Sequence, residues 1–157
     1  ASFRMDGRSR RRPRDRINAL LSFVYSLLMN DCRSAVEAAG LDPQIGFLHA
    51  VRPGRAALAL DLMEEFRAFA DRLVLSLINR GQLGRDDFVE REGGAVLLEG
   101  DARKTVLVAY QERKQESLSH PLLSEPVPFG LLPHVQARLL ARTLRGDTAE
   151  YLPYLVR

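Results

Sequence analysis

One histidine and three carboxylates lie close together in the stretch GFLHAVRPGRAALALDLMEEFR, and all four side chains can bind a divalent metal ion. His49 precedes a proline-glycine turn, and Asp61, Glu64 and Glu65 follow that turn. Residues three and four apart return to one side of a helix, where three carboxylates would repel one another. Mg²⁺ or Mn²⁺ would neutralise them, because both ions take carboxylate oxygen and Mn²⁺ also accepts imidazole.

The same residues also fit an ordinary helix, and without further information the metal signal is weak. Acidic runs on helices are mostly solvated faces, and a lone histidine is more often packed than bound to metal. On the residues alone, a metal site and a solvated face both stay open. His120 and His134 each lack a nearby set of ligands, so we expect structural roles for both.

Positive charge is concentrated near the start of the chain. Residues 4–16, RMDGRSRRRPRDR, hold seven arginines and two aspartates, whereas the formal net charge of the whole chain is only +3. Arginine suits phosphate, because the guanidinium group can donate two parallel hydrogen bonds to it. Contact with nucleic acid and a disordered basic tail or sorting signal therefore both stay open on composition alone.

Hydrophobic periodicity predicts a mainly α-helical fold. Asp15 can begin the first helix and Gly40 can end it, either as one helix or as two with a kink near Asn30-Asp31. In the second helix, Leu58, Leu62 and Phe66 should face the core. The helices are expected at about 15–40, 56–80, 101–119 and 129–144.

One small β-hairpin is also predicted, because FVERE and AVLLE flank Gly93-Gly94. The last segment, YLPYLVR, is apolar enough to dock on the body. A chain of 157 residues is about the size of one domain. We therefore expect an arginine-rich lead-in at 1–16 and one α-helical domain at 17–157.

Cysteine usage and hydropathy indicate a reduced compartment. Cys32 is the one cysteine, so no intrachain disulfide can form, and its helical apolar pattern predicts a packed thiol. The N-terminal residues lack the pattern of a secretory signal peptide. The apolar run ALLSFVYSLLM is too short to span a bilayer. These features predict a cytoplasmic protein with no membrane segment.

Several motifs in order resemble one family. NALLSFVYSLL, GFLH and PGRAALALDLMEEFR are similar to the CRISPR-associated spacer-acquisition integrase, the larger subunit of the adaptation complex. RKTVLVAYQERKQE and FGLLPHVQARLLARTLRGD resemble its type I-C branch, so the match covers essentially the whole chain. The family combines an N-terminal β-rich domain with an α-helical catalytic domain, and this chain resembles the helical domain only.

The resemblance implies a metal-dependent DNA endonuclease and integrase of prokaryotes. Such enzymes join the 3′-OH ends of a captured DNA duplex to a CRISPR repeat by transesterification, using Mg²⁺ or Mn²⁺. They act as homodimers, two of which flank a dimer of a small partner protein. Because arginines are dense beside the presumed metal site, we expect six of them to contact DNA phosphate in the full-length protein: Arg8, Arg10, Arg11, Arg12, Arg14 and Arg16.

The resemblance also implies the metal ligands. They are His49, Glu64 and a glutamate on a helix upstream of the arginine-rich segment, with Asp61 in a supporting position. We expect the chain to be a piece of a longer protein. The piece lacks this glutamate, and we therefore expect it to be inactive alone. The alternative is a helical DNA-binding or assembly module without chemistry of its own.

Overall fold

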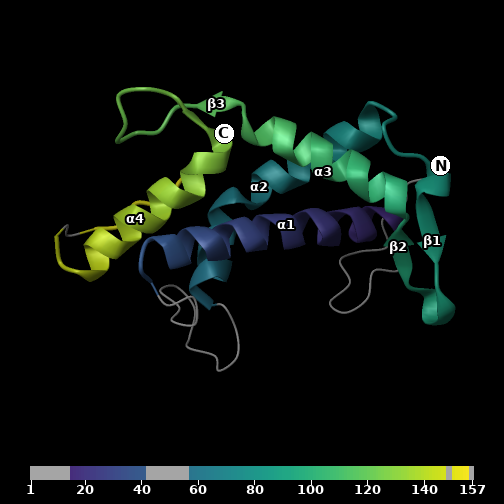
Figure 1. Ribbon diagram of the computed structural model, residues 1–157, viewed down its shortest axis with the longest axis horizontal. Coiled ribbons are helices and arrows are strands. Elements are labelled where there is room, and N and C mark those ends of the chain that lie inside the picture. Colours follow the sequence, from purple (N-terminus) through teal and green to yellow (C-terminus); the bar gives the residue numbers. More distant parts are fainter. Residues whose placement is uncertain (1–14, 42–56, 148–149, 156–157) are drawn as a thin grey trace. The chain divides into compact units, whose positions relative to one another are not determined.

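The computed structural model describes residues 15–41, 57–147 and 150–155, and these residues are mainly α-helical, as predicted. In this part of the chain the four α-helices are α1 (Arg16–Ala38), α2 (Ala57–Asn79), α3 (Gly100–Lys114) and α4 (Leu132–Leu144) (Figure 1). α1 is one continuous helix, so the predicted alternative of two helices is wrong. Gly40 follows α1 closely, as the sequence indicated, and Gly81 likewise follows α2.

The described residues group into two compact parts, and α1 and α2 each contribute to both. The first part holds the described residues up to 26 together with 69–113. The second part holds the described residues of 27–68 and of 114–157. The first therefore contains the β-hairpin and nearly all of α3, and the second contains α4 and the C-terminal segment 150–155.

In the first part, Asp15 begins α1 as predicted. Its Oδ1 accepts a hydrogen bond from the backbone N–H of Asn18 at 2.7 Å, and its Oδ2 accepts one from the Asn18 side chain at 2.8 Å. These contacts satisfy a backbone donor that the first turn of a helix leaves without a partner. Leu20 and Val24 then bury the inner face of α1.

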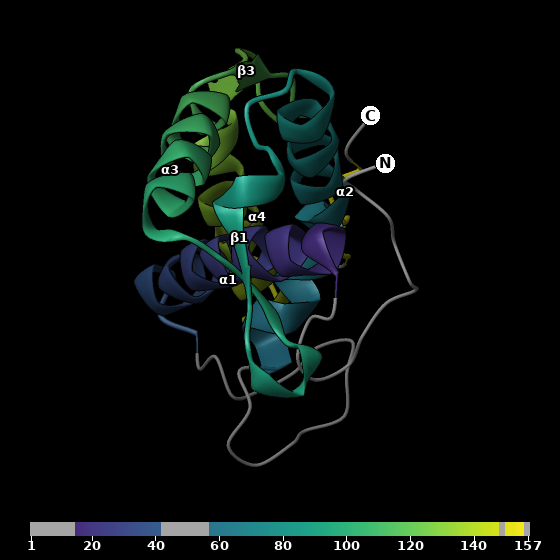
Figure 2. The same cartoon turned by 90° about the vertical axis from the view of Figure 1, so that its right-hand side faces the viewer.

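The predicted hairpin is present. Its strands β1 (Phe88–Glu90) and β2 (Val96–Leu98) are antiparallel, with Phe88 opposite Leu98. The connection is longer than the predicted two-residue turn, because it includes the short 3₁₀ helix η2 (Glu92–Gly94). Gly93 and Gly94 have φ angles of 80° and 81°, which glycine adopts without steric cost. The hairpin lies beside the first turns of α1 (Figures 1 and 2).

α3 is shorter than predicted. It ends at Lys114 rather than Ser119, because β3 (Ser117–Leu118) pairs with β4 (Val127–Pro128) in a second, unpredicted antiparallel pair. α3 buries Val106 and Tyr110, whereas Leu107 is 36% exposed. A further 3₁₀ turn, η1 (Arg85–Asp87), precedes the hairpin.

The core of the second part surrounds Phe66 of α2. Phe129, in the 3₁₀ turn η3 (Phe129–Leu131) before α4, meets the Phe66 ring edge-on with centroids 5.5 Å apart. Tyr154 stacks on Phe66 at 5.7 Å. The C-terminal segment therefore packs on this part, as its apolar residues predicted. Leu58, Leu62 and Phe66 are buried, which confirms the predicted inner face of α2.

Candidate functional site

The three carboxylates of α2 lie in three different surroundings, although their spacing suggested one shared side. Asp61 is 3% exposed and belongs to the buried side of the helix. Glu64 is exposed, and Glu65 is half-buried. Their backbone positions follow from α2, whose apolar residues Leu58, Leu62 and Phe66 decide which side turns inward.

Asp61 is the most unusual of the three by its position. Carboxylates are seldom fully buried, and those that are buried are usually hydrogen-bonded or bound to a cation, because burial removes their hydration. Asp61 lies on α2 between Leu58 and Leu62, both of which are buried. This burial sets Asp61 apart from the carboxylates of a solvated helix face.

Glu64 presents its carboxylate to solvent. Its Oε2 lies 3.3 Å from Nη1 of Arg67, and the Glu64 and Arg67 side chains are 42% and 44% exposed. An exposed ion pair of this kind contributes about 0–1 kcal/mol to stability. Glu64 can therefore exchange Arg67 for another cation at little cost.

Glu65 is engaged with the C-terminal segment. Its Oε1 accepts hydrogen bonds from the backbone N–H of Tyr154 at 2.7 Å and from Nε2 of Gln136 at 2.8 Å. Its Oε2 accepts one from the Tyr151 hydroxyl at 2.5 Å. Burial raises the pKa of Glu65, and these three hydrogen bonds oppose that rise. Burial and the nearby Glu65 charge also raise the pKa of Tyr151, so its hydroxyl keeps its proton.

Gln136 connects Glu65 to His120. The N–H of Leu122 donates to Nδ1 of His120 at 3.0 Å, so the proton of a neutral His120 ring is on Nε2. Nε2 then donates to Oε1 of the fully buried Gln136 at 2.7 Å. His120 is thus a packed, hydrogen-bonded histidine, as predicted, whereas His134 is half-exposed on α4.

Several predicted site residues lie outside the described residues. They are His49 and five of the six arginines: Arg8, Arg10, Arg11, Arg12 and Arg14. Arg16 is described, and it begins α1 with a half-exposed side chain. Within the described ranges, no group of three or more His, Cys, Asp or Glu side chains is placed to hold a metal ion. Asp61 and Glu64 nevertheless supply the carboxylate oxygens that Mg²⁺ and Mn²⁺ prefer.

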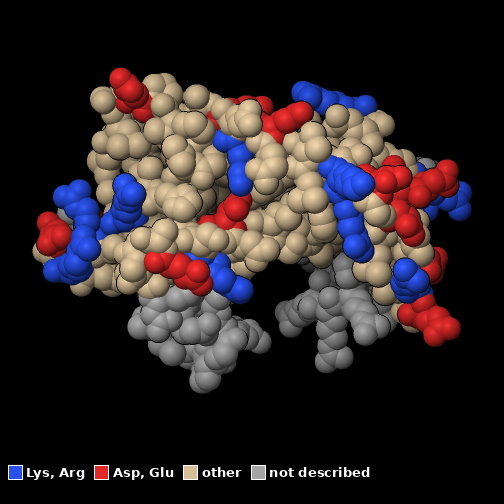
Figure 3. Space-filling view, in the orientation of Figure 1, with Lys and Arg blue, Asp and Glu red and all other residues tan. Residues whose placement is uncertain are grey.

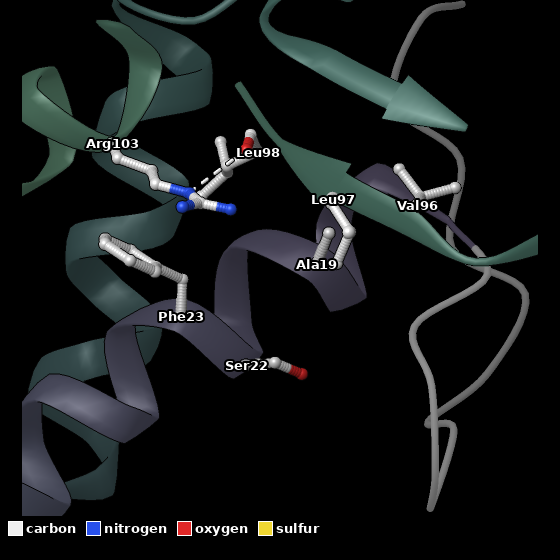
Figure 4. Close-up of a pocket in the computed structure, with 7 residues that line it drawn as sticks. All are labelled: Ala19, Ser22, Phe23, Val96, Leu97, Leu98 and Arg103. Carbon is white, nitrogen blue, oxygen red and sulfur yellow. Dashed lines mark hydrogen bonds between the residues drawn. The ribbon is translucent and has the colours of Figure 1, made fainter. Parts of the chain in front are cut away.

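A hollow of about 240 Å³ in the first part has a different chemistry. Figure 4 shows Phe23 of α1 and Leu97 of β2 beside it, with Arg103 of α3 at its edge. Nε of Arg103 donates to the carbonyl oxygen of Leu98 at 3.2 Å, so the guanidinium group is tied to the hairpin. The lining is mainly apolar and offers no acid or base for catalysis.

Cys32 is fully buried on α1, which confirms the predicted packed thiol. Burial raises its pKa, and the charges of Asp31 and Glu65 add to the rise. The thiolate, which is the nucleophilic form, is therefore strongly disfavoured.

Charge is mixed on the one face of the described residues that Figure 3 shows. On the face in Figure 3, Lys and Arg side chains alternate with Asp and Glu, and the described residues there form no broad patch of one sign. Among the described helices, none is long and apolar enough to cross a membrane. The sequence therefore still points to the arginine-rich segment as the main concentration of positive charge.

Comparison with known proteins decides the family. The family model described as CRISPR associated protein Cas1 matches residues 1–112. The chain belongs to the Cas1 family. A curated Cas1 relative, named CRISPR-associated endonuclease Cas1 1, from Moorella thermoacetica, is 62% identical over 157 residues, which are 99% of this chain and 46% of the relative. The chain thus spans about half the length of that Cas1 protein.

Two solved structures resemble this Cas1 chain closely. A casposase bound to integration product superposes with a TM-score of 0.89 at 26% identity, over 99% of this chain and 47% of the casposase chain. A partial Cas6-RT-Cas1–Cas2 complex gives a TM-score of 0.81 at 25% identity, over 98% of this chain and 46% of the matched chain. The helical fold described above is therefore the fold of part of these larger proteins.

Proposed function

We propose that this chain is the helical C-terminal domain of a metal-dependent DNA endonuclease and integrase that inserts captured DNA into a CRISPR array by transesterification. The observation that carries the proposal is the match to the Cas1 family, whose curated relative is named an endonuclease. The similarity to a casposase bound to integration product supports the joining of DNA as the reaction.

The proposed metal ligands are His49, Glu64 and the upstream glutamate that the family resemblance implies, with Asp61 beside them. Glu64 supports this assignment, because its carboxylate is exposed and only weakly paired with Arg67. Asp61 supports it as a buried carboxylate one helical turn before Glu64. When bound, Mg²⁺ or Mn²⁺ would stabilise negative charge on phosphodiester oxygens. The protein's part is to hold the two carboxylates in fixed positions on α2.

The proposed substrates and partners also rest on membership of the Cas1 family. Double-stranded DNA, both the captured spacer and the CRISPR repeat, would lie along the arginines that precede α1. The full-length protein would act as a homodimer and bind a small dimeric partner. A similar fold in a complex of Cas1 with Cas2 supports a partner of that kind.

Metal binding and strand transfer test the proposal directly. We would compare the 157-residue chain with a version extended upstream to the length of its relatives, using calorimetric titration with Mn²⁺ and a joining assay with duplex DNA. The extended protein should bind Mn²⁺ and join DNA ends. The shorter chain should bind Mn²⁺ weakly and join none, because one ligand is missing.

Two ligand variants and one control decide the outcome. His49→Ala and Glu64→Gln should each abolish joining in the extended protein, whereas Glu37→Gln, on an exposed residue of α1, should not. Tight Mn²⁺ binding by the short chain that survives His49→Ala would overturn the ligand assignment. A protein that binds DNA but shows no metal-dependent chemistry would instead be a helical DNA-binding or assembly module.

The arginine segment has a separate test. Each phosphate contact that is lost should lower the slope of log affinity against log salt by about 0.9 for duplex DNA. The double variant Arg10→Ala/Arg12→Ala should therefore reduce the slope by roughly 2. Arg85→Ala, on an exposed residue of η1, is the control. An unchanged slope in the double variant would show that these two arginines do not contact phosphate.

A further inference from the structure

Glu65 is held by three donors from two distant parts of the sequence. Gln136 lies 71 residues further along the chain, Tyr151 lies 86 residues further, and Tyr154 lies 89 residues further. Together they place a donor on each oxygen of the carboxylate. We name this set, Glu65 with Gln136, Tyr151 and Tyr154, the Glu65 bracket.

The residues that donate to Glu65 also make contacts with other side chains. Gln136 is fixed by His120 at 2.7 Å, and the Tyr151 hydroxyl accepts a further hydrogen bond from Nε2 of Gln136 at 3.0 Å. The Tyr154 ring stacks between Phe66, at 5.7 Å, and His120, at 5.8 Å. Because Gln136 and Tyr154 both contact His120, which lies outside α2, the bracket resists following Glu65 if α2 turns.

Because Glu65 lies on the same turn of α2 as Asp61 and Glu64, holding Glu65 also holds these two carboxylates. Glu65 follows Glu64 directly and comes one helical turn after Asp61 on a continuous helix. Carboxylate ends lie roughly 5–6 Å from a helix axis, so a 20° rotation of this turn would move them by about 2 Å. A displacement of about 1 Å at a reacting centre can already cost 100-fold in rate.

We propose that Glu65 is a positioning residue: the bracket locks the rotation of the α2 turn that carries Asp61 and Glu64, and Glu65 is not itself a metal ligand. The part of this inference that concerns metal rests on the proposed function. The part that concerns the helix turn rests only on the contacts above. The C-terminal segment 150–155 thereby acquires a role in the candidate site, because it supplies two of the three donors.

A matched pair of tyrosine variants isolates the bracket. Tyr151→Phe removes the hydroxyl that donates to Glu65. Tyr154→Phe removes a hydroxyl from the same segment that donates instead to the carbonyl of Ser119, and leaves the backbone N–H on Glu65. Glu65→Ala removes the acceptor altogether. Glu65→Gln is the conservative rescue, since its amide oxygen can still accept from Gln136 and Tyr154.

The first readout is amide hydrogen exchange in the 157-residue chain, without metal. Tyr151→Phe should make the amides of residues 61–65 exchange about 10-fold faster, because a hydrogen bond to a charged group is lost. Tyr154→Phe should change them less than about two-fold, since it leaves Glu65 bound. Equal rates in wild type and Tyr151→Phe would show that the bracket does not hold this turn.

The second readout is the Mn²⁺ dissociation constant of the extended protein. Groups that orient ligands typically matter 10–100-fold, so Tyr151→Phe should weaken Mn²⁺ about 10-fold and Glu65→Gln should keep most of the affinity. Complete loss of Mn²⁺ in Glu65→Gln with unchanged exchange would make Glu65 a ligand and overturn the inference. If the wild-type extended protein binds no Mn²⁺, the proposed metal site fails, and exchange alone decides whether the bracket holds the turn.

Discussion

The two halves of α2 are held by different kinds of contact. Residues 57–68 combine the buried Phe66 with the directed hydrogen bonds of the Glu65 bracket. Residues 69–79 rely mainly on apolar side chains, of which Phe69 meets the ring of Tyr110 edge-on at 6.3 Å. This half also has a polar contact, from the Tyr25 hydroxyl to Asp71, which is partly buried.

This difference separates stability from positioning. Apolar burial is strong but has little directional preference, so it can hold a helix in place and still allow a small rotation. Hydrogen bonds to a carboxylate depend on angle, and three of them define an orientation. The half of α2 with directed bonds is also the half that carries Asp61 and Glu64, where orientation would matter for chemistry.

The largest expected effect tests the apolar side of this comparison. Phe66 is 0% exposed, so Phe66→Ala should lower the free energy of unfolding by about 3–5 kcal/mol. Leu75→Ala on the same helix is the control, because Leu75 is 57% exposed and its loss should cost at most about 0.5 kcal/mol. Urea titrations measure both. A mild Phe66→Ala would mean that the bracket, rather than apolar burial, holds the first half of α2.

The sequence predicted those parts of the fold whose signals are local. Asp15 and Gly40 mark the ends of α1, and Gly93-Gly94 marks the hairpin. The Asp15 side chain accepts from a backbone N–H only three residues away, and each glycine acts through its own backbone. The pair of β3 and β4 was missed, since two-residue strands are too short to show a period. The end of α3 was therefore placed too late.

In the candidate site, too, local features were predicted from the sequence and long-range contacts were not. Helical spacing grouped Asp61, Glu64 and Glu65, but it could not separate them, because Glu65 takes its partners from residues 71 to 89 positions away. One local signal did exist. Gln136 stands between Leu132 and Leu140 on the buried stripe of α4, and a buried amide needs hydrogen-bond partners.

The smallest expected effect tests the polar side, by comparing two adjacent glutamates. At neutral pH, Glu64→Gln should change the free energy of unfolding by at most about 0.5 kcal/mol, because it removes only an exposed pair with Arg67. Glu65→Gln should change it by about 1 kcal/mol, since an amide oxygen replaces a carboxylate oxygen that accepts two N–H groups. Equal and negligible effects would contradict a special role for Glu65.

The contribution of Glu65 to the free energy of unfolding should depend on pH, and the direction of its raised pKa sets the sign of that dependence. Burial raises the pKa of Glu65 in the folded chain, so between its unfolded and folded pKa values the folded state binds more protons. The contribution of Glu65 to stability is therefore complete below the usual range of a glutamate and is lost as pH rises through the raised pKa. Subtracting the unfolding free energy of Glu65→Gln from that of wild type cancels the titration of all other groups. This difference should increase as pH falls from neutral, and a decrease would mean that the three donors outweigh burial at Glu65.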